Sequence, residues 1–169
     1  LKRLSLNPIE EDDFIDEDFN FKKYINQIVN SFEETSNKKF ILNFDQDASP
    51  RKIPKSIEII YGLRNFIGNA NKFAKEKIFI TLKSNNEYTE ITIEDDGEGY
   101  PGEILSKIGE PYLRSLKNKD KNQSGLGLGI FIGKNLLEKN FASLNCQNSK
   151  TRTGAEVNII WKNQDLKKI

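Results

Sequence analysis

The chain has 169 residues, and its 26 Lys and Arg nearly balance its 25 Asp and Glu, giving a formal net charge of +1. This length predicts one domain, and the balanced charge gives no electrostatic reason to expect nucleic acid or a membrane surface as a partner. The absence of histidine and the single cysteine exclude an internal disulfide and argue against a zinc site or a Ser-His-Asp triad.

The first 18 residues are highly charged and show no regular pattern, which is typical of a linker. They have no apolar core and therefore do not resemble a signal peptide. No apolar run in the chain approaches the roughly 18 residues of a membrane span. Because the sequence begins without Met, we expect it to be a piece of a longer protein.

Two helices and a strand are predicted next in chain order. Apolar residues recur with helical spacing over 19–34, and 38–45 is typical of a short strand. A turn-like segment then leads to Pro54, which could occupy the first turn of a second helix over about 55–75.

The second half of the chain contains four predicted strands and a further helix. Segments 77–84 and 88–95 alternate with a period of two and predict a hairpin. A glycine-rich acidic loop follows, and a helix is expected over 124–140. Two final strands are predicted at 142–148 and 155–161. Helices on one face of a mixed sheet are the simplest packing of these elements.

Three glycines, Gly125, Gly127 and Gly129, stand at the start of the last helical pattern and need a local reason. A helix N-terminus that binds phosphate and a tight loop-to-helix turn both fit them. The known glycine loops do not match. No strand precedes the glycines as a dinucleotide fold requires, and neither Gly-Lys-Ser/Thr nor a following Val-Ala-Ile-Lys strand is present.

Polar residues on the second helix form another candidate site. Asn65 and Asn69 are four residues apart and share one helix face, and Lys72 falls near them. Amide oxygens and an ammonium group on one face could hold Mg²⁺ and phosphate oxygens. A solvated polar face is the alternative.

The acidic loop after the predicted hairpin forms a third candidate site. Asp95 stands at a strand end, where its carboxylate can accept a hydrogen bond from an exocyclic amine such as that of adenine. Gly97 and Gly99 would let the main chain approach a flat ring. An ordinary acidic turn is the alternative.

The three motifs in this order resemble the ATP-binding catalytic domain of sensor histidine kinases, within the GHKL superfamily. Residues 65–73 resemble its N box, 95–101 its first glycine box and 125–129 its second. Residues 110–115 resemble the short aromatic box between them. The resemblance covers about residues 20–162. The stretches YGLRNFIGNANKFA, IGEPYLRS and GLGLGIFIGKNLLE are most like the RegB/PrrB-type redox-signalling kinases.

This resemblance implies an α+β fold, a two-layer α/β sandwich (the Bergerat ATP-binding fold) with helices on one face of a mixed sheet. The catalytic domain would span 19–163. Residues 164–169 would be a C-terminal tail, and 1–18 a linker from a missing upstream dimerisation and phosphoacceptor region. Residues 116–124 would form a mobile lid over ATP.

By the same resemblance, the cofactors are ATP and Mg²⁺. Asn69 would be the main Mg²⁺ ligand with Asn65 assisting, Lys72 would meet phosphate, and Asp95 would read the adenine amine. The implied catalytic residues are Asn65, Asn69 and Lys72. The implied ATP-binding set is Asn65, Asn69, Lys72, Phe73, Asp95, Gly97, Gly99, Tyr112, Gly125, Leu126, Gly127, Leu128 and Gly129.

The implied reaction transfers the γ-phosphate of ATP to a histidine, for relay to an aspartate on a response regulator. Because the chain has no histidine, the acceptor would lie outside it, and the domain alone should show little kinase activity. The parent protein would be anchored in the inner membrane with this domain in the cytoplasm. By resemblance, neither nucleic acid nor the membrane is expected to contact the domain directly.

Several departures from the family pattern leave alternatives open. Gly68 stands where an acidic residue is common, and Ala155 stands where threonine is common. Other GHKL ATPases usually carry a catalytic Glu four residues before the metal-binding Asn, where this chain has Asn65. A degenerate ATP site kept as an interaction module is a further alternative. Cys146, in a predicted strand, is expected to be a small buried residue.

Overall fold

A computed structural model describes residues 20–45, 52–108 and 124–169. The predicted linker, Tyr112 and all but the last residue of the predicted lid lie outside these ranges. The described elements are α2 (Phe21–Glu33), β1 (Lys39–Phe44), α3 (Ile57–Phe73), β2 (Lys77–Ser84), β3 (Tyr88–Asp95), α4 (Gly102–Lys107), α5 (Ser124–Lys139), β4 (Ser143–Asn148), β5 (Ala155–Lys162) and a final 3₁₀ turn, η3 (Leu166–Lys168).

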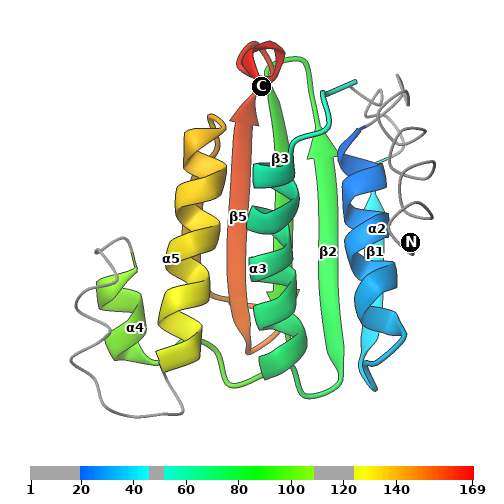
Figure 1. Ribbon diagram of the computed structural model, residues 1–169. Helices are drawn as coiled ribbons and strands as arrows, with labels where there is room; N and C mark the ends of the chain where they lie inside the picture. Colours follow the sequence, from blue (N-terminus) through cyan, green and yellow to red (C-terminus); the bar gives the residue numbers. More distant parts are fainter. Residues whose placement is uncertain (1–19, 46–51, 109–123) are drawn as a thin grey trace, which may run out of the picture.

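The strands form one mixed sheet in the order β1-β2-β3-β5-β4. β1 and β2 are parallel and are joined through α3, whereas every other neighbouring pair is antiparallel. Figure 1 shows α2, α3 and α5 side by side in a single layer over one face of this sheet. The predicted fold class, an α+β sandwich with helices on one face of a mixed sheet, is confirmed.

Side-chain caps fix where the first two described helices begin. Asn20 Oδ1 accepts from Lys23 N at 3.0 Å at the start of α2, and Ser56 Oγ accepts from Ile59 N at 3.3 Å at the start of α3. Pro54 therefore precedes α3 instead of occupying its first turn. Its carbonyl oxygen accepts from the Tyr24 hydroxyl at 2.9 Å, which ties the approach of α3 to α2.

The hydrophobic core fills the space between the helix layer and the sheet. β3 shows strict alternation, with its Thr89, Ile91, Ile93 and Asp95 side chains buried toward the helices. Trp161 on β5 is fully buried, and its ring centroid lies 4.5 Å from that of Phe21 on α2. Leu166 is also buried in this core, so the residues predicted as a tail pack against the domain.

One helix was not predicted. α4 is a short helix over Gly102–Lys107, which the mixed pattern after the acidic loop did not reveal. Its six residues form fewer than two turns, so its few apolar residues, Ile104 and Leu105, give too short a pattern to indicate a helix.

Candidate functional site

A cavity of about 380 Å³ lies where the C-terminal end of α3 meets the ends of β3 and β5. α3 contributes Asn69, Lys72 and Phe73 to its wall, and Asp95 comes from the end of β3. The loop after β3 contributes Gly99, and β5 contributes apolar side chains. The cavity therefore gathers residues from two of the three sequence motifs.

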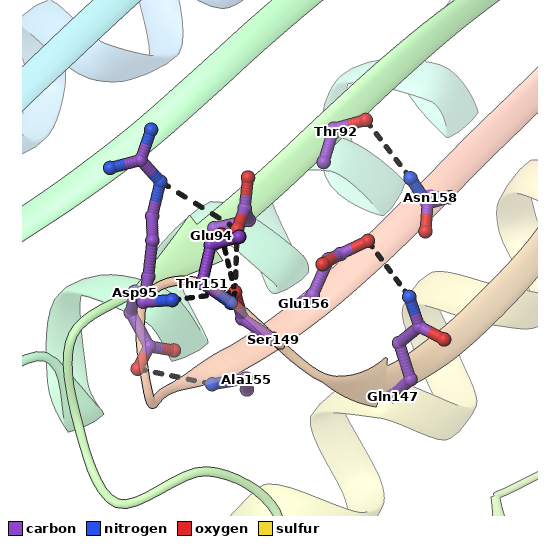
Figure 2. Close-up of polar contacts among 10 residues, drawn as sticks. Thr92, Glu94, Asp95, Gln147, Ser149, Thr151, Ala155, Glu156 and Asn158 are labelled. Carbon is purple, nitrogen blue, oxygen red and sulfur yellow. Dashed lines mark hydrogen bonds and ion pairs between the residues drawn. The ribbon is translucent and has the colours of Figure 1, made fainter.

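Asp95 is the buried carboxyl group of this cavity, with 3% of its surface exposed. Its Oδ1 accepts from the main-chain N–H of Gly97 at 2.8 Å and from that of Ala155 at 3.3 Å, and Figure 2 shows the second of these bonds. Burial raises the pKa of the Asp95 carboxyl, and the two N–H bonds offset part of that rise. The main chain thus holds a buried acceptor at the cavity wall.

Two glycines allow the main chain to pack directly on this carboxyl group. A Cβ on Gly154 would lie 2.0 Å from the carbonyl oxygen of Asp95 and 2.2 Å from its Oδ1. A Cβ on Gly97 would lie 2.2 Å from the carbonyl oxygen of Phe73. Neither position has room for a side-chain carbon, so both require glycine.

Asn69 connects the first motif to the glycine-rich helix. Its Nδ2 is buried and has no hydrogen-bond partner within the described part of the chain. A Cβ added to Gly129 on α5 would lie 3.3 Å from both Asn69 Nδ2 and Asn69 Oδ1. A buried amide donor without a partner is costly, and such a group at a cavity wall fits a site that a ligand completes.

The other residues of the first motif lie at different distances from the cavity. Lys72 is exposed at the rim, with its Nζ 5.3 Å from the centroid of the Phe73 ring. Asn65 lies one helical turn before Asn69 and is not among the residues lining the cavity. Its Nδ2 donates to the carbonyl oxygen of Tyr61 at 2.7 Å.

The glycine-rich stretch is helical from Ser124 onward. Gly125, Gly127 and Gly129 therefore lie within the first two turns of α5, inside the helix expected over 124–140. Close packing on α3 is one reason for Gly129, which lies against Asn69, and it also applies to Gly133 further along α5, where a Cβ would lie 2.8 Å from the Phe66 ring. Leu128 is 40% exposed, and the side chain of Leu126 is not described.

Sequence reasoning missed Asn148, at the end of β4, as a residue that shapes the cavity. Its Oδ1 accepts from Tyr100 N at 2.6 Å, and its Nδ2 donates to the carbonyl oxygen of Tyr100 at 3.1 Å. The Asn148 amide therefore pairs with both main-chain groups of Tyr100, as the main chain of a neighbouring strand would, and this holds the loop after β3 in place. Gly99, with φ of +83°, packs against the same side chain. No local signal could reveal this contact, because it joins residues 48 apart.

Asp96 is a second carboxylate that the sequence analysis did not single out, and it holds the main chain where α3 leads into β2. Asp96 accepts from the main-chain N–H groups of Lys75, Glu76 and Lys77 at 2.7 to 3.2 Å, where α3 leads into β2. Its slight burial tends to raise the pKa of Asp96, but these N–H bonds outweigh it and lower the pKa. Asp95 and Asp96 are therefore adjacent carboxyl groups with opposite shifts.

Cys146 lies behind the cavity wall. It is half-buried on β4, and its thiol forms a hydrogen bond with the hydroxyl of Tyr100. Burial raises the pKa of the Cys146 thiol to about 11, although the bond to Tyr100 opposes the rise. The thiol is thus protonated at neutral pH, and Cys146 packs as a small side chain that is half-buried instead of buried as expected.

A cluster of metal-ligating side chains and a membrane-spanning helix are both absent from the described residues. No group of three or more His, Cys, Asp or Glu side chains in 20–45, 52–108 and 124–169 could hold a metal ion. Over the same residues, every helix is too short or too polar to cross a membrane.

Residues 55–165 match the family described as histidine kinase-, DNA gyrase B- and HSP90-like ATPases. The sensor histidine kinase RegB of Cereibacter sphaeroides is 39% identical over 120 residues, which are 62% of this chain and 26% of RegB. The sensor protein kinase WalK of Staphylococcus aureus is 28% identical over 148 residues, covering 82% of this chain and 23% of WalK. The chain thus spans about a quarter of the length of these relatives.

Solved structures show the same fold. The catalytic domain of histidine kinase ThkA has a TM-score of 0.68 at 23% identity, covering 85% of this chain and 93% of that one. The mycobacterial sensor histidine kinase MprB has a TM-score of 0.66 at 18% identity, covering 85% of this chain and 96% of that one. The predicted resemblance to RegB-type sensor kinases is confirmed. The chain belongs to the family of histidine kinase-, DNA gyrase B- and HSP90-like ATPases, and its domain is therefore an ATP-binding one.

Proposed function

We propose that this domain is the catalytic part of a sensor histidine kinase, which binds Mg-ATP in the cavity beside α3 and passes the γ-phosphate to a histidine outside this chain. The observation that carries the proposal is the joint position of Asp95 and Asn69 on the wall of one cavity, each with hydrogen-bonding capacity directed to a ligand. The similarity to RegB supports kinase chemistry over the other activities of the family.

Asp95 would select adenine. Its Oδ1 is occupied by two main-chain N–H groups, so the carboxyl group is fixed in place before the nucleotide arrives. The exocyclic amine of adenine donates a hydrogen bond that a fixed carboxylate accepts, whereas a purine carbonyl at the same ring position cannot donate. The apolar side chains of Ile93 and Val157 line the same cavity and would contact the ring.

Asn69 fits the phosphate end of the nucleotide and its magnesium ion. Mg²⁺ prefers oxygen ligands and retains several waters, so the Asn69 amide oxygen suffices as a protein ligand. The unpaired Asn69 Nδ2 would donate to a phosphate oxygen. Asn65, whose nitrogen is held by Tyr61, would present its oxygen to a water of the ion. Bound Mg²⁺ would neutralise charge on the transferring phosphoryl group.

Lys72, at the cavity rim, would contact a phosphate oxygen as a positive point charge. Gly97, Gly99 and Phe73 would shape the purine side of the pocket, while Gly125, Leu126, Gly127, Leu128 and Gly129 would flank the phosphates. The first N–H groups of α5 have no partner within their own helix, so this helix end suits an anion. Tyr112 and the lid segment would cover the nucleotide.

The phosphate acceptor would belong to another part of the parent protein. The 169 residues contain no histidine, so phosphoryl transfer requires an acceptor segment that this chain does not supply. We infer a dimerising helical hairpin as its source and a response regulator as the next carrier of the phosphate. The inner-membrane anchor of the parent and the cytoplasmic position of this domain belong to the same proposal.

Calorimetric titration with a non-hydrolysable ATP analogue, with and without Mg²⁺, tests the nucleotide site. We expect magnesium-dependent binding that Asn69→Ala and Asp95→Ala each weaken at least tenfold, since each loses a charged or metal-linked contact. Asn135→Ala on α5 and Asp165→Asn at the far end of the sheet are matched controls and should bind as the unaltered chain does. Absence of binding at millimolar nucleotide would contradict the proposal.

A separate assay distinguishes a kinase from another ATPase of the family. The domain alone, given Mg-ATP, should release phosphate at a negligible rate because Asn65 stands where an activating glutamate would be needed. Steady hydrolysis without a histidine-bearing partner would instead favour an ATPase function. Binding without transfer to any supplied acceptor hairpin would favour an interaction module.

A further inference from the structure

The sheet face opposite the helices carries a row of half-buried polar side chains, part of which Figure 2 shows. Side chains alternate between the two faces of a strand, so Glu94 points to this open face while the adjacent Asp95 points to the cavity. The Glu94 side chain is only 15% exposed. It therefore lies directly behind the residue assigned to adenine, on the other side of β3.

Glu94 is connected to the turn that joins β4 to β5. Its Oε2 accepts from the Ser149 hydroxyl at 2.8 Å and lies 3.6 Å from Arg152 Nε. The Arg152 guanidinium carbon is 3.6 Å from the centroid of the Phe79 ring on β2, so the arginine is stacked as well as paired. One carboxylate thus contacts both the first residue of the turn and its arginine.

The same turn is closed by Ser149. Its Oγ accepts from Thr151 N at 3.3 Å and from Arg152 N at 3.1 Å, and its own N–H donates to the carbonyl oxygen of Gly154 at 2.8 Å. Thr153 has φ of 70°, a conformation that a non-glycine residue keeps only when its surroundings hold it. Ser149 therefore fixes the turn, and Glu94 fixes Ser149.

The far end of this turn is the wall of the Asp95 site. Gly154 packs against the main chain and carboxyl group of Asp95, and Ala155 N donates to Asp95 Oδ1 at 3.3 Å. These contacts close a loop. Asp95 is bonded to Glu94 along β3, Glu94 is hydrogen-bonded to Ser149, and the turn that starts at Ser149 leads to Ala155, which is hydrogen-bonded to Asp95. A shift of the turn would move one of the two donors that hold the carboxyl group.

We propose that Glu94, acting through Ser149 and Arg152, is a positioning residue for adenine selection: it holds the turn of 149–154 so that Gly154 and Ala155 fix Asp95. This inference rests on the proposed nucleotide site. The Glu94 side chain is not among those lining the cavity, so its carboxylate would act on the nucleotide through its contacts with the turn.

The first test compares Glu94→Ala with Glu94→Gln and with Glu90→Ala as a matched control. Glu90 lies on the same strand and face, and its Oε1 accepts from Thr92 and Asn158 away from the turn. Affinities for ADP and for inosine diphosphate, which lacks the amine, are measured by calorimetry. Glu94→Ala should weaken ADP binding about tenfold and leave inosine diphosphate unchanged.

The other variants separate positioning from general damage. Glu94→Gln keeps an acceptor for Ser149 and should restore most of the preference for ADP, and Glu90→Ala should keep all of it. Ser149→Ala should reproduce Glu94→Ala, and the double variant should be no worse than either one, because both break the same loop of contacts. Equal weakening of both nucleotides, or an unchanged ratio in Glu94→Ala, would overturn the inference.

A measurement without nucleotide keeps the inference independent of the proposed function. Hydrogen exchange at the Ala155 amide, followed by NMR, should be faster in Glu94→Ala than in the unaltered chain and in Glu90→Ala. If no variant binds either nucleotide, the proposed function fails, and this exchange rate still decides whether Glu94 holds the turn. Equal Ala155 exchange in all three chains would overturn the positioning role.

Discussion

At the scale of single residues, the candidate site depends on one buried carboxyl group held by main-chain N–H groups. Asp95 combines a raised pKa with two fixed donors, so the folded chain accepts an electrostatic cost at this position. Residues whose burial opposes their charge are common at functional sites, because a ligand can supply the missing interaction. This cost leads to a prediction on pH dependence.

Asp95→Asn should stabilise the nucleotide-free domain at neutral pH while weakening ADP binding about tenfold through loss of a charge-assisted bond. A carboxyl with a raised pKa binds its proton more tightly in the folded state. The unaltered chain therefore loses stability as the pH rises from the ordinary value of 3.8 through the raised one. Urea unfolding of both chains between pH 4 and 8 should show the advantage of Asp95→Asn growing with pH. A constant difference would contradict the raised pKa.

Gly154→Ala tests the close packing on Asp95. The added Cβ would lie 2.0 Å from a carbonyl oxygen, so the turn or the carboxyl group must move, at a cost of about 1–3 kcal/mol in the free energy of unfolding. ADP binding should weaken as well. Gly102→Ala is the control, because a Cβ there meets no atom within 4 Å. Denaturant unfolding and calorimetry check both effects, and equal behaviour of the two variants would refute the packing argument.

At the scale of elements, the antiparallel helices α3 and α5 meet along a seam of glycines. Gly62 lies against Leu137, Gly133 against Phe66, and Gly129 against Asn69. Lys139 and Asn140, where α5 ends, contact Glu58 at the start of α3, at 3.4 and 3.2 Å. The seam thus sets the distance between the asparagine motif and the glycine-rich helix.

Gly133→Ala tests this seam, and Gly68→Ala, at a glycine of α3 that faces Phe32 instead of α5, is its matched control. Both replacements gain about 1 kcal/mol of helix propensity. At Gly133 the new Cβ would lie 2.8 Å from a packed Phe66 carbon, so overpacking should cancel the gain and destabilise the domain by roughly 1 kcal/mol. At Gly68 the nearest atom is the edge of the Phe32 ring at 3.3 Å, and net stabilisation is expected. Thermal unfolding measures the stability change in both variants. A Gly133→Ala variant more stable than the unaltered chain would contradict close packing of α5 on Phe66.

The elements themselves follow from local sequence. Apolar spacing predicted α2, α3 and α5, and alternation predicted β2 and β3, because burial of one face imposes those periods on a chain. The other three strands were also predicted, from short apolar stretches next to turns. The helix caps were harder to recognise in the sequence. The predicted second helix, with Pro54 in its first turn, therefore starts earlier than α3, which begins at Ile57 after the Ser56 cap. The glycines of α5 were interpreted through phosphate binding or a tight turn into the helix. Packing of Gly129 and Gly133 on α3 could not be foreseen, since the chain separates them by 60 residues or more.

At the scale of the whole molecule, the site is assembled by the sheet order. Asp95 ends β3, Asn148 ends β4 and Ala155 begins β5, and the order β3-β5-β4 brings these three strand ends together. The motifs indicated Asp95, Asn69 and Lys72, but nothing local marked Asn148, Ser149 or Gly154. Their roles depend on strand register, in which Asn148 pairs with Ala155 across β4 and β5.

Nucleotide binding should be visible as stability of the entire fold. A ligand that binds only the folded state at 100 times its Kd adds about 2.7 kcal/mol to the free energy of unfolding. For a domain of this size that corresponds to a rise in Tm of roughly 5–10 °C. Thermal melts with Mg-ADP should show this rise in the unaltered chain and lose it in Asp95→Ala. A Tm unmoved by millimolar Mg-ADP would contradict a preformed pocket.

The two main-chain hydrogen bonds to Asp95 determine which mutations the candidate site can tolerate. Both donors to the carboxyl group are peptide N–H groups, which survive replacement of side chains, and the limits are set by the lack of room for a Cβ at Gly97 and Gly154. A substitution that inserts a single carbon at either of these two glycines should therefore be severe, although it removes no donor to the carboxyl group. An alanine scan that skips glycines would overlook both positions, and a glycine-to-alanine scan would find them.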